Sequence, residues 1–164
     1  MKKRLSTTVT KRHRFAVQRF ITVTLMAFAI ASASQESVYP LDNGQNIDFD
    51  DISGKWVVIG YWASWCGPCR EEIRILNEIH RHRTKHNVIV LGLNFDGVKG
   101  EELASQKAVF GSEFPDLLAD PRERWDEPRP DFIPRTIVVD PQGELSAVIV
   151  GSTTRKEILE KITR

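Results

Sequence analysis

The stretch WVVIGYWASWCGPCR, residues 56–70, joins an apolar run to a pair of cysteines. Residues 56–63 are rich in β-branched and aromatic side chains, which predicts a strand buried inside a sheet. An amphipathic helix is expected from about Gly67 to Arg83, because apolar residues recur there at helical spacing. The sequence therefore puts Cys66 and Cys69 where a buried strand passes into the first turn of a helix.

This position predicts a reactive thiol. The start of a helix carries about half a unit of positive charge on its free N–H groups, which stabilises a thiolate. The pKa of a thiol placed there falls below its ordinary value, so the thiol becomes nucleophilic at neutral pH. We expect Cys66 to receive most of this effect and to be more exposed than Cys69. In the predicted mechanism, the Cys66 thiolate attacks a disulfide of a partner, and Cys69 then releases the reduced partner.

Two other uses of the cysteine pair need to be weighed. A static disulfide would add little stability, because a ring this small removes little chain entropy. A zinc site is the second alternative, since Cys66 and Cys69 followed by His82 and His86 satisfy the C2H2 spacing. The apolar strand before the pair and the Gly-Pro between the thiols argue against it. We therefore expect neither a metal nor a cofactor.

The first 33 residues have the pattern of an export signal. They contain seven basic and no acidic residues, an apolar run that starts at residue 20, and an Ala-x-Ala site at 31–33. The apolar run falls short of the ~20 residues that span a bilayer, so we predict a cleaved signal peptide over residues 1–33. An uncleaved anchor formed by residues 20–33 is the alternative. Export implies a periplasmic or otherwise external location, where a cysteine pair is oxidised unless something reduces it.

The remainder of the chain has the size and charge of one ordinary globular domain, expected over residues 36–164. Residues 34–164 hold 16 basic and 22 acidic residues, and this negative balance argues against nucleic acid as a partner. The stretch from 120 to 131 is expected to be a loop. The predicted regular elements are a hairpin at 38–49 with an Asn43-Gly44 turn, strands at 56–63, 88–95, 114–119, 136–139 and 145–150, and helices at about 67–83, 100–110 and 154–163.

Two segments carry a resemblance to a known family. Residues 61–70, YWASWCGPCR, resemble the active-site segment of the thioredoxin superfamily, and residues 132–143, FIPRTIVVDPQG, resemble its cis-proline segment. The hairpin, the export signal and residues 51–56 are similar to the TlpA/ResA branch of exported thiol-disulfide oxidoreductases. The resemblance covers residues 36–164. It implies an α/β fold, a thioredoxin-like three-layer sandwich with a mixed central sheet, flanking helices and an N-terminal β-hairpin.

The resemblance also implies a substrate-binding surface. Pro134 is expected to be cis and to face the cysteines, and the backbone of Ile133 to pair with an extended segment of the substrate. An ordinary trans proline before a strand is the alternative. Trp65, Gly67 and Pro68, which flank the thiols, are expected to complete this surface.

Glu72 is the third candidate catalytic residue, because this branch commonly carries a glutamate three residues after the second cysteine. Position i+3 shares a helix face with Cys69. A buried carboxyl there would have a raised pKa and would be able to shuttle a proton for Cys69. An exposed helix glutamate is the alternative. Many thioredoxins carry a buried aspartate six residues before the first cysteine, and Gly60 stands there instead, which gives Glu72 more weight.

The predicted function is the reduction of disulfides in exported proteins by thiol–disulfide exchange. Gly-Pro between the cysteines resembles strongly reducing relatives, near about −270 mV, rather than strong oxidants near about −120 mV. A thiol oxidase or isomerase is the enzymatic alternative, and a binding module with a structural disulfide is the non-enzymatic one. The expected partners are protein thiols and disulfides of the cell envelope, and the resemblance implies a membrane electron donor. We expect a monomer, because no dimerisation segment is evident.

Overall fold

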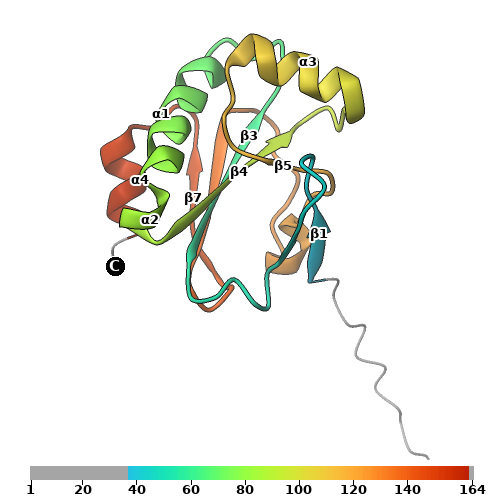
Figure 1. Cartoon of the computed structure of the whole chain (residues 1–164). Helices are drawn as coiled ribbons and strands as arrows, with labels where there is room; N and C mark the ends of the chain where they lie inside the picture. The colour runs from blue at the N-terminus through green and yellow to red at the C-terminus, as the bar shows by residue number, and fades with distance from the viewer. Residues whose placement is uncertain (1–36, 163–164) are drawn as a thin grey trace, which may run out of the picture. The chain divides into compact units, whose positions relative to one another are not determined.

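The computed structural model describes residues 37–162, so the export signal predicted for residues 1–33 lies outside the described part. A five-stranded sheet in the order β5-β4-β3-β6-β7 forms its centre (Figure 1). Strands β3, β4 and β5 are parallel, whereas β6 is antiparallel to β3 and β7 to β6. The predicted mixed α/β sheet is thereby confirmed. The strands are β3 (Trp56–Trp62), β4 (Val88–Asn94), β5 (Asp116–Leu117), β6 (Arg135–Val139) and β7 (Leu145–Val150).

Strand β3 lies in the middle of the sheet because it is apolar on both faces. Every residue after Trp56 is buried. Val58 and Trp62 belong to one hydrophobic cluster, whereas Val57 and Ile59 belong to a second cluster on the other face. Burial on both faces explains why the sequence of this strand is continuously apolar rather than alternating.

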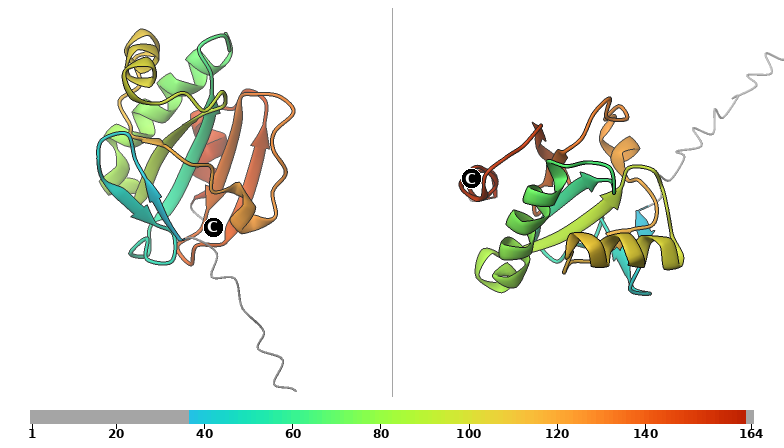
Figure 2. Two further views of the ribbon diagram at one scale, coloured as in Figure 1. Left: turned by 90° about the vertical axis from the view of Figure 1, so that its right-hand side faces the viewer. Right: turned by 90° about the horizontal axis from the view of Figure 1, so that it is seen from above.

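Helices α1 (Cys69–Arg81) and α4 (Arg155–Lys161) pack together on one face of the sheet (Figures 1 and 2). Their buried side chains share a cluster with those of α3 (Gly100–Phe110). Helix α1 is shorter than predicted, and a separate short helix, α2 (Arg83–His86), follows it and ends at Asn87 with a positive φ of 48°. Within residues 37–162, no helix combines the length and the apolarity needed to cross a membrane.

The N-terminal hairpin of β1 (Val38–Pro40) and β2 (Asn46–Asp48) lies on the opposite side from α1 (Figure 1). It packs on the second cluster together with Trp125, which ends the short 3₁₀ helix η1 (Arg122–Trp125). The Trp125 Nε1–H donates to the carbonyl of Gly143 at 2.9 Å, and its ring meets that of Phe49 edge-on at 5.3 Å. This layer closes the sandwich opposite the helices.

Three further local predictions differ from the structure. The hairpin loop is not a two-residue turn, because at Asn43-Gly44 only the glycine has a positive φ and the loop is instead anchored to β5 by a hydrogen bond from Asp42. The segment 120–131 contains η1 rather than being entirely loop. Strand β5 is only two residues long. Pro115 before it has no N–H to extend the ladder, and the N–H of Leu118 after it donates to the Pro40 carbonyl of β1.

Candidate active site

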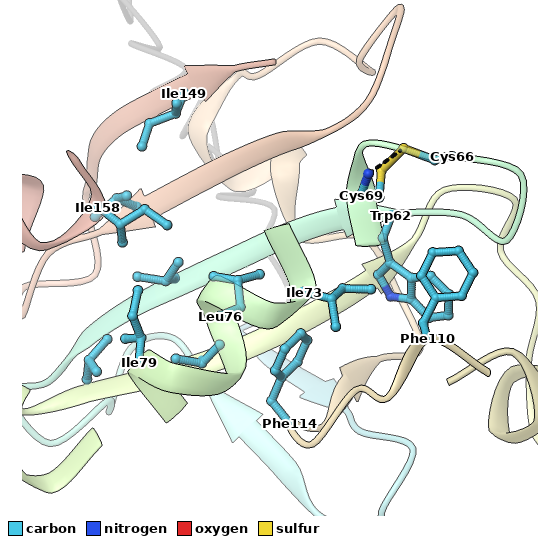
Figure 3. Close-up of a cluster of buried hydrophobic side chains, with 14 of the residues drawn as sticks. Trp62, Cys66, Cys69, Ile73, Leu76, Ile79, Phe110, Phe114, Ile149 and Ile158 are labelled. Carbon is cyan, nitrogen blue, oxygen red and sulfur yellow. Dashed lines mark hydrogen bonds between the residues drawn. A yellow bond between two sulfur atoms is a disulfide. The ribbon is translucent and has the colours of Figure 1, made fainter. Parts of the chain in front are cut away.

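The cysteine pair follows the carboxyl end of β3, and a disulfide joins Cys66 to Cys69 with their Cα atoms 5.3 Å apart (Figure 3). The backbone N–H of Cys69, the first residue of α1, donates to Cys66 Sγ over 3.2 Å. A helix leaves this N–H without an intrahelical partner. In the reduced protein it would therefore stabilise negative charge on the Cys66 sulfur. This geometry favours Cys66 as the nucleophile.

Both cysteines are buried. Cys66 is 3% exposed and Cys69 is 0% exposed, so Cys66 is the more accessible thiol, as predicted, but by a small margin. The chain turns back after β3, with the Cys66 N–H donating to the Ala63 carbonyl at 3.1 Å, and this turn brings Cys66 onto the hydrophobic core. The exposed surface beside the pair is supplied by Trp65 and the Gly67-Pro68 dipeptide.

The structure contradicts the zinc alternative. Cys69 begins α1 and His82 follows its last residue, so the two are separated by the whole helix, about 20 Å at 1.5 Å per residue. The Nδ1 of His82 lies 2.8 Å from the Glu78 carbonyl, within the same helix end. Across residues 37–162, no group of three or more His, Cys, Asp or Glu side chains is arranged to hold a metal ion.

Glu72 is buried, with only 3% of its surface exposed, whereas its neighbour Glu71 points outward and pairs with Arg74. The Thr136 hydroxyl on β6 donates to the Glu72 carboxylate. Burial raises the pKa of Glu72 to about 7, and the hydrogen bond from Thr136 opposes part of that rise. The carboxyl therefore gains and loses its proton in the pH range in which thiol–disulfide exchange takes place. A group that shuttles a proton has to do so.

Gly60 explains why the buried carboxyl comes from the helix and not from β3. Gly60 pairs with Thr136 in the register of β3 and β6. A Cβ at Gly60 would lie 2.5 Å from Leu76 Cδ1 of α1, so any side chain there would require Leu76 to move. The only buried carboxyl that reaches Thr136 among the described contacts is that of Glu72.

We predict that replacing Glu72 by glutamine makes the protein more stable at high pH. The folded carboxyl keeps its proton up to a pKa of about 7, compared with 4.5 when unperturbed. Between these values the folded state binds more protons than the unfolded state, so the free energy of unfolding falls as pH rises. Glutamine removes this penalty, and the gain should be absent at pH 4 and reach about 3 kcal/mol above pH 8.

Urea unfolding at several pH values checks this expectation. The buried carboxyl of Asp116, whose pKa is raised to about 6, also makes the free energy of unfolding fall as pH rises. It remains in the variant, so the relevant quantity is the difference between Glu72→Gln and the wild type. Glu71→Gln, at the exposed neighbouring position, serves as the matched control. Equal stabilities of Glu72→Gln and wild type at pH 8 would contradict a buried charged carboxyl.

The Ile133–Pro134 peptide bond is cis, as the resemblance implies. Ile133 is half-buried and packs against the cluster that contains both cysteines, while the preceding Phe132 is 58% exposed. Arg135, which follows the cis proline, does not extend into solvent, because it forms an ion pair with Glu127. The segment therefore presents an apolar surface beside an arginine whose charge is paired with that of Glu127.

The partners of Trp65 were not predicted from the sequence. This side chain is 62% exposed, and its Nε1–H donates to Asp96 at 2.8 Å while its ring meets the edge of Phe95. The guanidinium of Arg129 also contacts Phe95, 4.7 Å from the centre of its ring. Because β3 and β4 are parallel and in register at Trp62 and Asn94, the residues just after β4 had to lie near the cysteines. The rule that parallel strands end at one edge would have identified Asp96.

A mixed sheet of this order, with a Cys-x-x-Cys pair between the central strand and the first helix, is characteristic of thioredoxin-like thiol-disulfide oxidoreductases, and this chain has the fold and the cysteine pair of that class. The model of the AhpC/TSA family matches residues 30–148, more than half of the chain. The chain belongs to the AhpC/TSA family.

Comparison with individual proteins agrees with this assignment. The chain is 28% identical over 116 residues to the thiol-disulfide oxidoreductase ResA of Bacillus subtilis (strain 168), a match that covers 71% of this chain and 64% of that protein. It is 28% identical over 138 residues to ResA of Geobacillus kaustophilus (strain HTA426), covering 80% and 75%. The crystal structure of StoA from Bacillus subtilis superposes with a TM-score of 0.60 at 19% identity, over 76% of this chain and 93% of that one, which shows the fold alone.

Proposed function

We propose that this protein reduces disulfides of exported proteins through its Cys66–Cys69 pair. The observation that supports it most directly is the 3.2 Å contact between the Cys69 N–H and Cys66 Sγ at the start of α1. Because this N–H stabilises a thiolate, the Cys66 sulfur is both a good nucleophile towards a partner disulfide and a good leaving group when Cys69 attacks it. The names of the ResA relatives support thiol–disulfide exchange as the reaction.

The proposed reaction transfers two electrons to the partner. The Cys66 thiolate attacks one sulfur of the partner disulfide, which forms a mixed disulfide and releases the other sulfur as a thiolate that takes up a proton. Cys69 then loses its proton and attacks Cys66 Sγ, which breaks the mixed disulfide and releases the second partner thiol. We assign the acceptance of the Cys69 proton to Glu72, the buried carboxyl one turn further along the same helix. Glu72→Gln should then change the pH profile of turnover as well as that of stability.

The proposed substrate surface is apolar and surrounds the buried thiols. Trp65, next to Cys66, is 62% exposed, and Phe132, two residues before the cis proline, is 58% exposed. Exposed apolar side chains grouped at one place on a surface mark contact sites for partners. The backbone at Ile133, next to the cis proline, is proposed to pair with an extended segment of the partner.

The proposed direction of reaction gives a measurable prediction. We expect the reduction potential of the Cys66–Cys69 couple to lie near about −270 mV, because the same Gly-Pro dipeptide occurs in strongly reducing relatives. Equilibration of the purified protein with dithiothreitol or glutathione redox buffers at pH 7 measures this value. A potential above about −150 mV would reverse the assignment and favour a thiol oxidase. A disulfide that exchanges with neither buffer would favour the binding module.

We further propose that the protein acts outside the cytosol as a monomer, on protein thiols and disulfides of the cell envelope. Residues 1–33 carry the charge and apolar pattern of an export signal, with an anchor formed by residues 20–33 as the alternative. A reductase in an oxidising compartment must be reduced again after each turnover, so the proposal includes a membrane electron donor. Fractionation of cells that express the full chain tests the location.

A further inference from the structure

A buried charged network lies behind the cysteine pair, and the reaction proposed above does not use it. Its centre is Asp116 on β5, which is 0% exposed. The Nε1–H of Trp62 donates to one carboxylate oxygen of Asp116 at 2.7 Å, and the Lys107 ammonium lies 3.2 Å from the other. Burying a carboxylate costs free energy, because the charge loses its hydration. A buried ion pair is therefore not by itself evidence that the contact stabilises the fold.

Asp116 is tied to several elements through Lys107 and through its own backbone. Lys107 also pairs with Asp42 of the hairpin loop and donates to the Phe114 carbonyl at 2.8 Å. Asp42 accepts the backbone N–H of Asp116 at 2.9 Å. A Cβ at Gly92 would lie 2.4 Å from Asp116 Oδ1, so glycine on β4 makes the space that the carboxylate occupies. The hairpin loop, α3, β4 and β5 thus meet around Asp116.

Trp62 connects this network to the thiols. Its side chain is 1% exposed and belongs to the same hydrophobic cluster as Cys66 and Cys69 (Figure 3). Its ring lies 5.4 Å from that of Phe110, which in turn lies 4.3 Å from the guanidinium of Arg70. Trp62 ends β3 just four residues before Cys66, so a shift of its indole would be transmitted directly to the segment that carries the pair.

We propose that Asp116 is a positioning residue for disulfide exchange: it fixes the indole of Trp62, on which the segment of Cys66 and Cys69 rests. The inference depends on the proposed exchange activity and adds a residue to it. Closure of the Cys66–Cys69 disulfide depends on how closely the chain holds the two sulfurs together, which is an effective concentration of one thiol at the other. A loosened indole lowers that concentration, so the disulfide becomes easier to reduce and Cys69 resolves mixed disulfides more slowly.

The test removes each half of the Trp62–Asp116 hydrogen bond in turn. Asp116→Leu removes the acceptor, keeps the same branched shape with the same number of heavy atoms, and leaves Lys107 paired with Asp42. Trp62→Phe removes the donor and keeps an aromatic ring. In each variant we expect the equilibrium constant for disulfide formation, measured against dithiothreitol, to fall about tenfold, a shift of about 30 mV towards a less negative potential. In the double variant the fall should be no larger than in Trp62→Phe alone, because Asp116 acts through that indole.

Asn77→Ala is the matched control. Asn77 is also buried and donates to the Gly111 carbonyl at 2.7 Å, but it contacts neither Trp62 nor a cysteine in the described hydrogen bonds. It should lower stability and leave the redox equilibrium within twofold of wild type. If Asp116→Leu does not fold, the Trp62→Phe variant alone tests the proposed role of the Trp62–Asp116 hydrogen bond. A folded Trp62→Phe protein with an equilibrium constant within twofold of wild type overturns the inference, whereas a wild-type protein that exchanges with no thiol overturns the proposed function itself.

Discussion

Cys66→Ser is expected to lose disulfide reductase activity by at least about 1000-fold, the scale seen when an enzyme loses its nucleophile. A serine hydroxyl in the place of Cys66 Sγ would not ionise at neutral pH, so the Cys69 N–H that contacts this position would have no thiolate to stabilise. The remaining thiol, Cys69, is fully buried and cannot be reached by a partner disulfide. The turbidity assay of insulin reduction with dithiothreitol as electron source measures the loss.

Cys69→Ser is the matched control for this experiment, since both variants lose the same disulfide but only one loses the proposed nucleophile. Thermal unfolding of the two should be similar. Labelling with a thiol reagent at limiting concentration should modify Cys69→Ser at Cys66 and leave Cys66→Ser largely unmodified. Insulin reduction by Cys66→Ser at more than a few per cent of the wild-type rate would contradict the assignment of the nucleophile.

The second large effect is a loss of turnover in the Cys69→Ser variant. Cys66 can still attack a partner disulfide, but the intramolecular thiol that releases the partner is gone. Effective concentrations in well-oriented intramolecular reactions far exceed the millimolar thiol available in solution. Turnover should therefore fall by about 100-fold or more, and the mixed disulfide should accumulate.

Non-reducing electrophoresis and mass spectrometry detect that adduct. It should contain one partner chain per protein molecule, disappear on addition of dithiothreitol, and fail to form in the double variant Cys66→Ser/Cys69→Ser. Absence of any adduct after incubation with a disulfide-containing protein would contradict the resolving role of Cys69, even if Cys66 proves to be the nucleophile.

Much of the fold was predictable because its signals are local. The apolar run before the cysteines predicted the central strand, and the periodicity after them predicted α1 to within two residues at each end. The cis proline was implied by the resemblance of residues 132–143 to the thioredoxin family, and it is present. The turn at Asn43-Gly44 was predicted less well, because Asp42 in that loop bonds to β5 and this tertiary contact outweighs the local preference for a two-residue turn.

The site was predictable only in part for a related reason. Glu72 was identified by the resemblance and by its place one turn after Cys69, but its hydrogen-bond partner Thr136 lies 64 residues away in the sequence. The Trp65–Asp96 and Trp62–Asp116 hydrogen bonds join residues separated by 31 and 54 positions. No periodicity or motif relates such pairs. They follow from the register of β3 with β4 and of β4 with β5, which brings the ends of these strands to one edge.

The order of elements, the place of the cysteines between strand and helix and the class of chemistry were determined by the sequence alone, since each depends on residues that are close neighbours in the chain. The tertiary structure alone decided which polar groups are buried and what they touch. It turned Arg135 inward onto Glu127, gave Glu72 its raised pKa, and placed a charged carboxylate at Asp116 against Trp62. The physical reason is that the cost of burying a charge, and the partners that offset it, are set by elements that meet only when the chain is folded.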